Sequence, residues 1–287
     1  MISIKDVNNI LEKYELGNRG KAVAIEILQY YQVDEKICIV ILIETILHVR
    51  YVMKLLSDKW ICVEEEEKRS EFSEILRVDV TIEDYFGEDL KTISFGNIKT
   101  LGRLLADMHT ISINHECHLQ KGATYCALFS GRVDIDRIWG ANKNILLEAN
   151  LYKKVKAVHE MSISKIKNMW TDLPVYAVHG DLGLLSNVTI YNNRYGIIDF
   201  NLSGDEVLLN DMLVTWYSSV YSFDIALILS LKERTENRKV FFSSYLNNRN
   251  LNAKEREYLY DMACIINGVY FNRFVALLAS KGLKKSV

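Results

Sequence analysis

Apolar side chains change their spacing along the first third of the chain. Over residues 3–16 they recur three and four positions apart, which predicts an amphipathic helix with Ser3 as its N-cap. Three β-branched and aromatic runs then follow, at residues 22–33, 37–45 and 50–56. Because their connections are short and polar, we expect an antiparallel meander.

The pattern then becomes mostly helical. Residues 63–77 begin acidic and continue as an amphipathic helix. Residues 78–90 then have the pattern of an apolar strand followed by acidic and aromatic residues and Gly87. Further helical patterns cover residues 97–109, 144–170, 211–231, 235–247 and 253–280. This order predicts an α+β protein, with a small antiparallel sheet followed by a mostly helical second part.

Composition narrows the class of protein without naming an activity. A length of 287 residues favours two domains, and a net charge of −2 gives no basic field for nucleic acid. The five cysteines are scattered and form no CxxC pair, which is typical of reduced thiols in the cytoplasm. The longest apolar run, residues 37–43, suits a buried strand and is too short for a membrane span. We therefore expect a cytoplasmic protein without a membrane segment.

Residues 175–200 concentrate the candidate chemistry. An entry strand leads into His179 and Asp181, and two further strands, joined by a polar turn, lie between Asn187 and Asp199. Both aspartates thus fall at strand ends, and with the asparagine they form an oxygen-only set that suits Mg²⁺. The alternative is that these side chains only cap turns.

The order His-Gly-Asp, Asn187 and Ile-Asp-Phe at 198–200 resembles the signature of the aminoglycoside phosphotransferase and choline kinase-like family. The spacing departs in one place, because Asn187 follows Asp181 by six residues, where the family usually has five. The resemblance implies a two-lobed protein-kinase-like fold. Its nucleotide-binding N-lobe would span residues 1–86, and residues 87–287 would form a C-lobe with the catalytic loop and acceptor-binding helices.

The resemblance also implies roles for individual residues. Asp181 would be the catalytic base, and Asn187 and Asp199 would hold Mg²⁺ on the phosphates of ATP or GTP. Lys54 would contact these phosphates, fixed by Glu71 or alternatively Glu67. The remaining assignments are adenine recognition at the hinge by Ile82, Glu83, Asp84 and Tyr85, and structural support by His179 and Asp211. The connection between the first two strands contains no glycine, unlike the phosphate-covering loop of many kinases.

The acceptor is indicated only by charge. Residues 199–231 carry five acidic side chains and no Lys or Arg. Asp205 and Glu206, with nearby aromatic residues, would suit a small cationic molecule that carries a hydroxyl, such as an aminoglycoside. A solvated loop beside an aromatic core is the alternative. We therefore expect a small-molecule kinase with no nucleic-acid or membrane partner. A metabolic kinase of the homoserine or choline type and a regulatory pseudokinase are the alternatives, and the oligomeric state stays open.

A second cluster contains His109, His115, Cys117 and His118 and has the composition of a metal site. Its spacing fits no standard zinc pairing, so we expect structural roles for these side chains.

Overall fold

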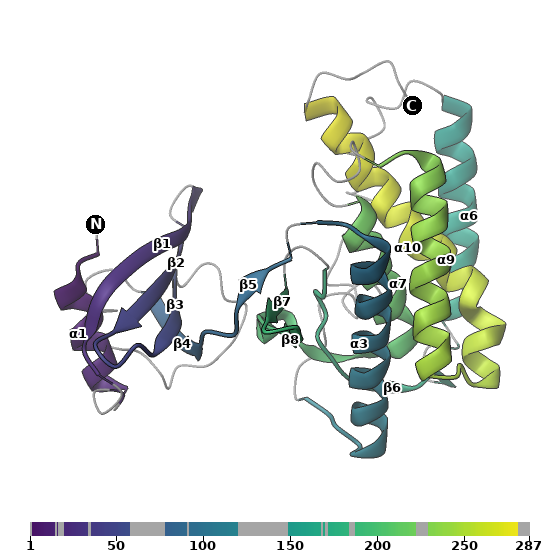
Figure 1. Ribbon diagram of the computed structural model, residues 1–287. Coiled ribbons are helices and arrows are strands. Elements are labelled where there is room, and N and C mark those ends of the chain that lie inside the picture. Colours follow the sequence, from purple (N-terminus) through teal and green to yellow (C-terminus); the bar gives the residue numbers. More distant parts are fainter. Residues whose placement is uncertain are drawn as a thin grey trace. The chain divides into compact units, whose positions relative to one another are not determined.

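The computed structural model describes residues 2–14, 16, 20–33, 36–57, 78–90, 92–119, 149–167, 169, 172–183, 187–221 and 229–280. The chain divides into two compact units, Met1–Gly87 and Glu88–Val287 (Figure 1). The first is a helix on a sheet and the second is mostly helical, which confirms the predicted α+β class. The nucleotide-binding and acceptor-binding roles assigned to the two parts stay predictions.

The first unit begins with helix α1, Ile4–Lys13, which has the expected N-cap. The Ser3 hydroxyl accepts from the Asp6 N–H at 3.2 Å, and the Asp6 carboxylate accepts from the Ser3 N–H at 2.9 Å. This reciprocal capping box satisfies two backbone donors at the start of the helix. One face of this helix is apolar and fully buried, and it consists of Val7, Ile10 and Leu11.

The sheet of the first unit is the predicted meander. Its strands are β1 (Ala22–Val33), β2 (Lys36–Thr45), β3 (Arg50–Ser57) and β4 (Val78–Asp84). They are antiparallel and lie in the order β1-β2-β3-β4. Alternate residues of the sheet bury one face against α1, among them Ile41, Ile43, Tyr51, Met53, Leu55 and Val80.

In the described residues of the second unit there are five α-helices. These are α3 (Phe95–Asn114), α6 (Ala149–Lys167), α7 (Leu208–Tyr221), α9 (Leu231–Asn248) and α10 (Ala253–Ser280). Helix α3 lies along α9, and α10 packs against α6 and α7 (Figure 1). The backbones of α3 and α9 approach closely at Gly102, where an added Cβ would lie 2.6 Å from the Phe241 carbonyl oxygen. No described helix has a stretch long and apolar enough to cross a membrane.

Two small sheets hold the segment that the sequence singled out. Strands β7 (Val188–Tyr191) and β8 (Arg194–Ile197) form the predicted hairpin, to which β5 (Glu88–Asp89) adds a third strand. Both turn residues, Asn192 and Asn193, have positive φ, which fits a tight turn of the hairpin type.

The second small sheet pairs β6 (Val175–Val178) with β9 (Gly204–Val207). A short 3₁₀ turn (Phe200–Leu202) leads from Asp199 into β9. The four residues of β9 are stabilised by pairing with β6, a partner distant in sequence.

Candidate active site

Asp181 lies in the loop that follows β6, and its side chain is exposed to solvent. The neighbouring His179 is fully buried and connects this loop to the strand that leads to Asp199. Its Nε2–H donates to the Ile198 carbonyl oxygen at 2.8 Å, while its Nδ1 accepts from the Asp181 N–H at 3.3 Å. These bonds use both ring nitrogens within the loop, which is a structural role rather than proton transfer to a substrate.

Asn187 reaches the Asp181 loop despite the additional residue between them. Its side-chain Nδ2 donates to the Asp181 carbonyl oxygen at 2.6 Å, and the Asn187 residue is 6% exposed. Because the amide nitrogen is engaged, Oδ1 is the atom left to accept a bond or bind a cation. Residues 184–186, where the spacing departs from the family pattern, lie outside the described residues.

Asp199 has an unusual backbone conformation. It follows β8 with φ 65° and ψ 64°, the left-handed region that is costly for most residues other than glycine. Strain of this kind often marks functional sites. The Ile198 N–H donates to the Asn187 carbonyl oxygen at 3.1 Å, so Asp199 lies one residue beyond a bond that joins both sides of the hairpin. The two proposed metal ligands are therefore placed by the same hairpin.

Two serine hydroxyls fix the backbone on either side of Asp181. Ser112, near the end of α3, donates to the Ala177 carbonyl oxygen at 2.8 Å. The Ser218 hydroxyl of α7 lies 3.1 Å from the Leu182 carbonyl oxygen and 3.1 Å from the Thr215 carbonyl oxygen of its own helix, so its hydrogen bridges α7 and the loop. The position of the loop therefore depends on both helices.

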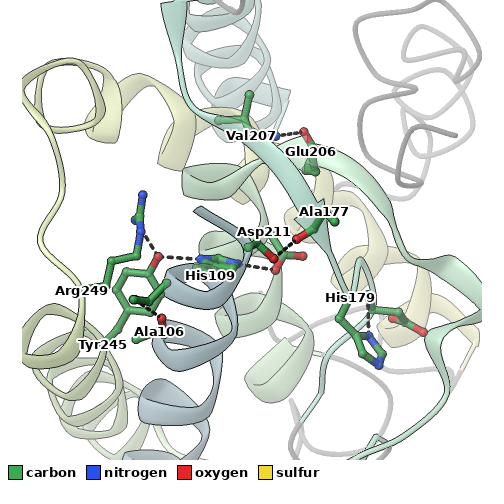
Figure 2. Close-up of polar contacts among 12 residues, drawn as sticks. Ala106, His109, Ala177, His179, Glu206, Val207, Asp211, Tyr245 and Arg249 are labelled. Carbon is green, nitrogen blue, oxygen red and sulfur yellow. Dashed lines mark hydrogen bonds and ion pairs between the residues drawn. The ribbon is translucent and has the colours of Figure 1, made fainter. Parts of the chain in front are cut away.

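Asp211 lies in the first turn of α7 and is 2% exposed. Its Oδ2 is 3.0 Å from Nε2 of His109, and Nδ1 of His109 is 2.7 Å from the Tyr245 hydroxyl (Figure 2). Burial lowers the pKa of His109, although the Asp211 carboxylate opposes this effect. Sequence reasoning assigned Asp211 to structural support and missed Tyr245, because nothing local marks a buried tyrosine as a partner of a distant histidine.

In the first unit, Lys54 lies on the face of β3 that points away from α1, since its neighbours Met53 and Leu55 are in the core. Its Nζ is 3.3 Å from the Glu83 carboxylate, and the Lys54 side chain is only 8% exposed. Sequence reasoning did not identify Glu83 as a charge partner of Lys54. The expected partners, Glu71 and Glu67, lie outside the described residues.

The proposed hinge residues 82–84 are the end of β4, which is an edge strand of the described sheet. The Tyr85 N–H donates to the Arg50 carbonyl oxygen at 3.0 Å. Alternation along an antiparallel pair then turns the backbone groups of Asp84 and Ile82 away from β3. Of the four residues predicted for the hinge, Ile82 and Asp84 are therefore the two whose backbone groups point away from β3.

The candidate acceptor residues lie on β9 rather than in an open loop. Glu206 is 1% exposed and accepts from the Val207 N–H at 2.8 Å, so it has almost no surface for an acceptor (Figure 2). Asp205 accepts from the Leu119 N–H at 2.7 Å, and its side chain is 26% exposed. Trp216, one of the nearby aromatic residues, packs against Phe241 in the core.

Two of the histidines near the end of α3 have separate polar partners. His109 is held by Asp211 and Tyr245, whereas His118 lies 3.3 Å from the Asp205 carboxylate and stacks on Tyr176. Within the described ranges, no group of three or more His, Cys, Asp or Glu side chains is arranged to hold a metal ion.

Comparison with solved structures identifies the fold. An amicoumacin kinase solved with AMP-PNP and Ca²⁺ matches 92% of this chain over 86% of its own length, at 12% identity and a TM-score of 0.52. A spectinomycin phosphotransferase solved with ADP and spectinomycin matches 99% of this chain over 91% of its own, at 12% identity and a TM-score of 0.51. A choline kinase from Cryptosporidium parvum Iowa II matches 99% over 95%, at 13% identity and a TM-score of 0.56.

The chain has the protein-kinase-like fold of the aminoglycoside phosphotransferase and choline kinase-like enzymes. The resemblance inferred from residues 179–200 is thereby confirmed at the level of the fold. No protein-family model matches the sequence. No curated protein matches it either.

Proposed function

We propose that this protein is a small-molecule kinase, which transfers the γ-phosphate of ATP or GTP to a hydroxyl group of a small, cationic acceptor. The observation that carries the proposal is the hydrogen-bonded arrangement of Asp181, Asn187 and the strand before Asp199. It occurs in a fold shared with solved phosphotransferases of antibiotics and choline. Catalysis of phosphoryl transfer consists mainly of positioning and charge neutralisation, and this arrangement supplies groups for both.

Within this proposal, each residue has a defined task. The Asp181 carboxylate orients the acceptor hydroxyl and receives its proton, and its exposure leaves it accessible to a substrate. Lys54 neutralises phosphate charge, and the edge of β4 at Ile82 and Asp84 recognises the adenine. His179 and Asp211 hold the loop from within the protein.

The oxygen ligands present fit Mg²⁺. The amide nitrogen of Asn187 is engaged by the Asp181 carbonyl oxygen, so its Oδ1 is the side-chain atom that can act as a ligand, and Asp199 adds a carboxylate. Hard oxygen ligands of this kind, used together with phosphate oxygens, are typical of magnesium sites in kinases. When bound, Mg²⁺ would neutralise charge on the nucleotide phosphates.

The nature of the acceptor rests on fewer residues. Asp205 keeps exposed carboxylate surface on β9 and remains in the proposal, whereas burial of Glu206 disfavours a direct contact. A carboxylate favours a cationic acceptor, such as an aminoglycoside or an amino alcohol.

The test is transfer of labelled γ-phosphate from ATP or GTP, with Mg²⁺, to aminoglycosides, spectinomycin, choline, ethanolamine and homoserine. We expect turnover with at least one acceptor. Asp181→Asn should lower kcat by at least about 100-fold, because general-base catalysis contributes roughly that much. Asp172→Asn, at an exposed position before β6, is the matched control and should leave kcat unchanged.

Two results would refute the kinase proposal. One is Mg²⁺-dependent nucleotide binding without transfer to any acceptor, which would favour a regulatory pseudokinase. The other is full activity in the Asp181→Asn variant.

A further inference from the structure

A chain of buried polar side chains runs from the junction of α9 and α10 to Asp211. Glu255 accepts from Arg249 at 2.6 Å, and Arg249 donates to the Tyr245 hydroxyl at 2.7 Å. Tyr245 in turn contacts His109, which contacts Asp211 (Figure 2). None of these five side chains is more than 7% exposed. Four helices, α3, α7, α9 and α10, therefore share one polar network.

The partners in this network fix the position of each proton. The Asp211 carboxylate can only accept, so the nitrogen of His109 that faces it, Nε2, carries hydrogen. At Tyr245 the Arg249 guanidinium can only donate, so the tyrosine hydrogen is directed to Nδ1 of His109. His109 is then neutral and protonated at Nε2, in agreement with its lowered pKa. A protonated Nδ1 would leave the tyrosine hydrogen without an acceptor among these residues.

The end of the network bears on the candidate active site. His109 and Asp211 join α3 to α7, and these helices carry Ser112 and Ser218, which bond the backbone before and after Asp181. A change in how the two helices meet would therefore be transmitted to both ends of the loop.

We propose that Tyr245, itself held by Arg249, is a positioning residue. Its hydroxyl donates to Nδ1 of His109, supports the neutral Nε2–H tautomer that Asp211 selects, and thereby keeps α3, α7 and the Asp181 loop in place. The catalytic consequence rests on the proposed function, whereas the tautomer does not. The substitution Tyr245→Phe isolates this role because it keeps the ring and removes only the hydroxyl. It deprives Nδ1 of its donor and Arg249 of one acceptor.

The matched control is Tyr258→Phe. Tyr258 is 2% exposed and belongs to the same apolar core, but it lies on α10 outside the network. Both substitutions remove one hydroxyl from a buried ring. A difference between the variants therefore reports the network rather than the general cost of changing a core tyrosine.

The first measurement is the pair of imidazole ¹⁵N shifts of His109 at pH 7.5 in histidine-labelled protein. The wild type and Tyr258→Phe should show the neutral Nε2–H tautomer. In Tyr245→Phe the Asp211 carboxylate still holds the Nε2 hydrogen, and the Nδ1 shift should move away from its wild-type value because Nδ1 has lost the hydrogen bond from Tyr245. Amide hydrogen exchange at Leu182 should become at least about 10-fold faster in Tyr245→Phe only, since that N–H neighbours the loop backbone that the two helices hold.

The second measurement is steady-state kinetics with the acceptor found above. Tyr245→Phe should lower kcat about 10-fold or more through misplacement of Asp181, with the nucleotide KM within about twofold of the wild type. If Tyr245→Phe does not fold, Arg249→Lys is the second variant. An ammonium lacks the planar fork with which Arg249 binds Tyr245 and Glu255 together, so the ¹⁵N shifts, exchange rate and kcat should change in the same direction. The changes should be smaller, because the Tyr245 hydroxyl is still present.

The inference is overturned if wild-type His109 is charged or carries its proton on Nδ1. It is also overturned if Tyr245→Phe matches Tyr258→Phe in the ¹⁵N shifts and in exchange. A wild-type protein that shows no transfer to any acceptor refutes the kinase function alone, since the ¹⁵N shifts and exchange rates still decide the role of Tyr245.

Discussion

The ion pair between Arg249 and Glu255 offers a quantitative test of the second unit. Both side chains are buried, at 5% and 1% exposure, and the nearest oxygen and nitrogen are 2.6 Å apart. Glu255 also accepts from the Asn252 N–H at 2.9 Å, and the Asn252 side chain accepts from the Glu255 N–H at 2.8 Å. The carboxylate thus pairs a buried cation and caps α10 at the same time.

Replacing Glu255 by glutamine keeps the shape and one acceptor oxygen but removes the charge. Removing one partner of a buried pair leaves the other charge uncompensated and costs about 3–5 kcal/mol of unfolding free energy. We expect about 3 kcal/mol, at the lower end, because the amide oxygen still accepts one hydrogen bond. For a chain of this size, each kcal/mol corresponds to a loss of roughly 2–4 °C in Tm.

The control lies two residues further along the same helix. Glu257 is paired with Lys254, and both side chains are about half exposed, at 53% and 45%. Glu257→Gln should therefore cost less than about 0.5 kcal/mol. Urea unfolding followed by tryptophan fluorescence measures both variants, since Trp216 lies in the core of this unit. Equal losses in the two variants would refute the conclusion that burial sets the strength of the pair.

Two further predictions concern packing and pH. Gly102→Ala should destabilise the protein by roughly 1–3 kcal/mol, because the new Cβ would lie 2.6 Å from the Phe241 carbonyl oxygen. Gly96→Ala should be neutral or stabilising in the same urea assay, because its Cβ would make only an ordinary contact, 3.8 Å from the Ser94 hydroxyl oxygen. Burial lowers the pKa values of His109 and His159 from about 6.5, so the unfolded state binds more protons below that pH. The full contribution of both histidines to the free energy of unfolding should be present above about pH 6.5. As the pH is lowered further, this free energy should fall by up to about 1.4 kcal/mol per pH unit for each histidine, until the pH reaches the pKa of that histidine in the folded state. Urea unfolding at pH 7.5 and 5.5 should show a smaller difference in His159→Gln than in the wild type, and an unchanged difference would contradict the assignment.

Elements governed by local sequence were predictable. The capping box at Ser3 and Asp6 and the asparagines of the β7–β8 turn act within a few residues, so their signals are complete in the sequence. The strands of the first sheet were equally clear, because they are long and their partners follow directly along the chain.

Features that depend on distant partners were not predictable in the same way. Strand β9 has four residues and exists through pairing with β6, and Tyr245 functions through His109, which is 136 residues away. The ion pair of Lys54 with Glu83 also depends on a distant contact. The sequence alone indicates only that Glu83 lies in a strand, and the register of β3 and β4 places it diagonally across from Lys54. In each case the decisive contact is tertiary, and the local pattern is compatible with several outcomes.

The six-residue spacing between Asp181 and Asn187 is compatible with the proposed chemistry, because other contacts fix both residues. The Ile198 carbonyl oxygen accepts from His179, and its N–H donates to the Asn187 carbonyl oxygen. Asn187 returns to the Asp181 carbonyl oxygen through its side chain, and the Asp181 N–H donates to His179. These four bonds form a closed ring through the loop and the hairpin. The relative position of Asp181 and Asn187 is therefore fixed by this ring of contacts, so the six-residue spacing by itself does not argue against the proposed roles of the two residues.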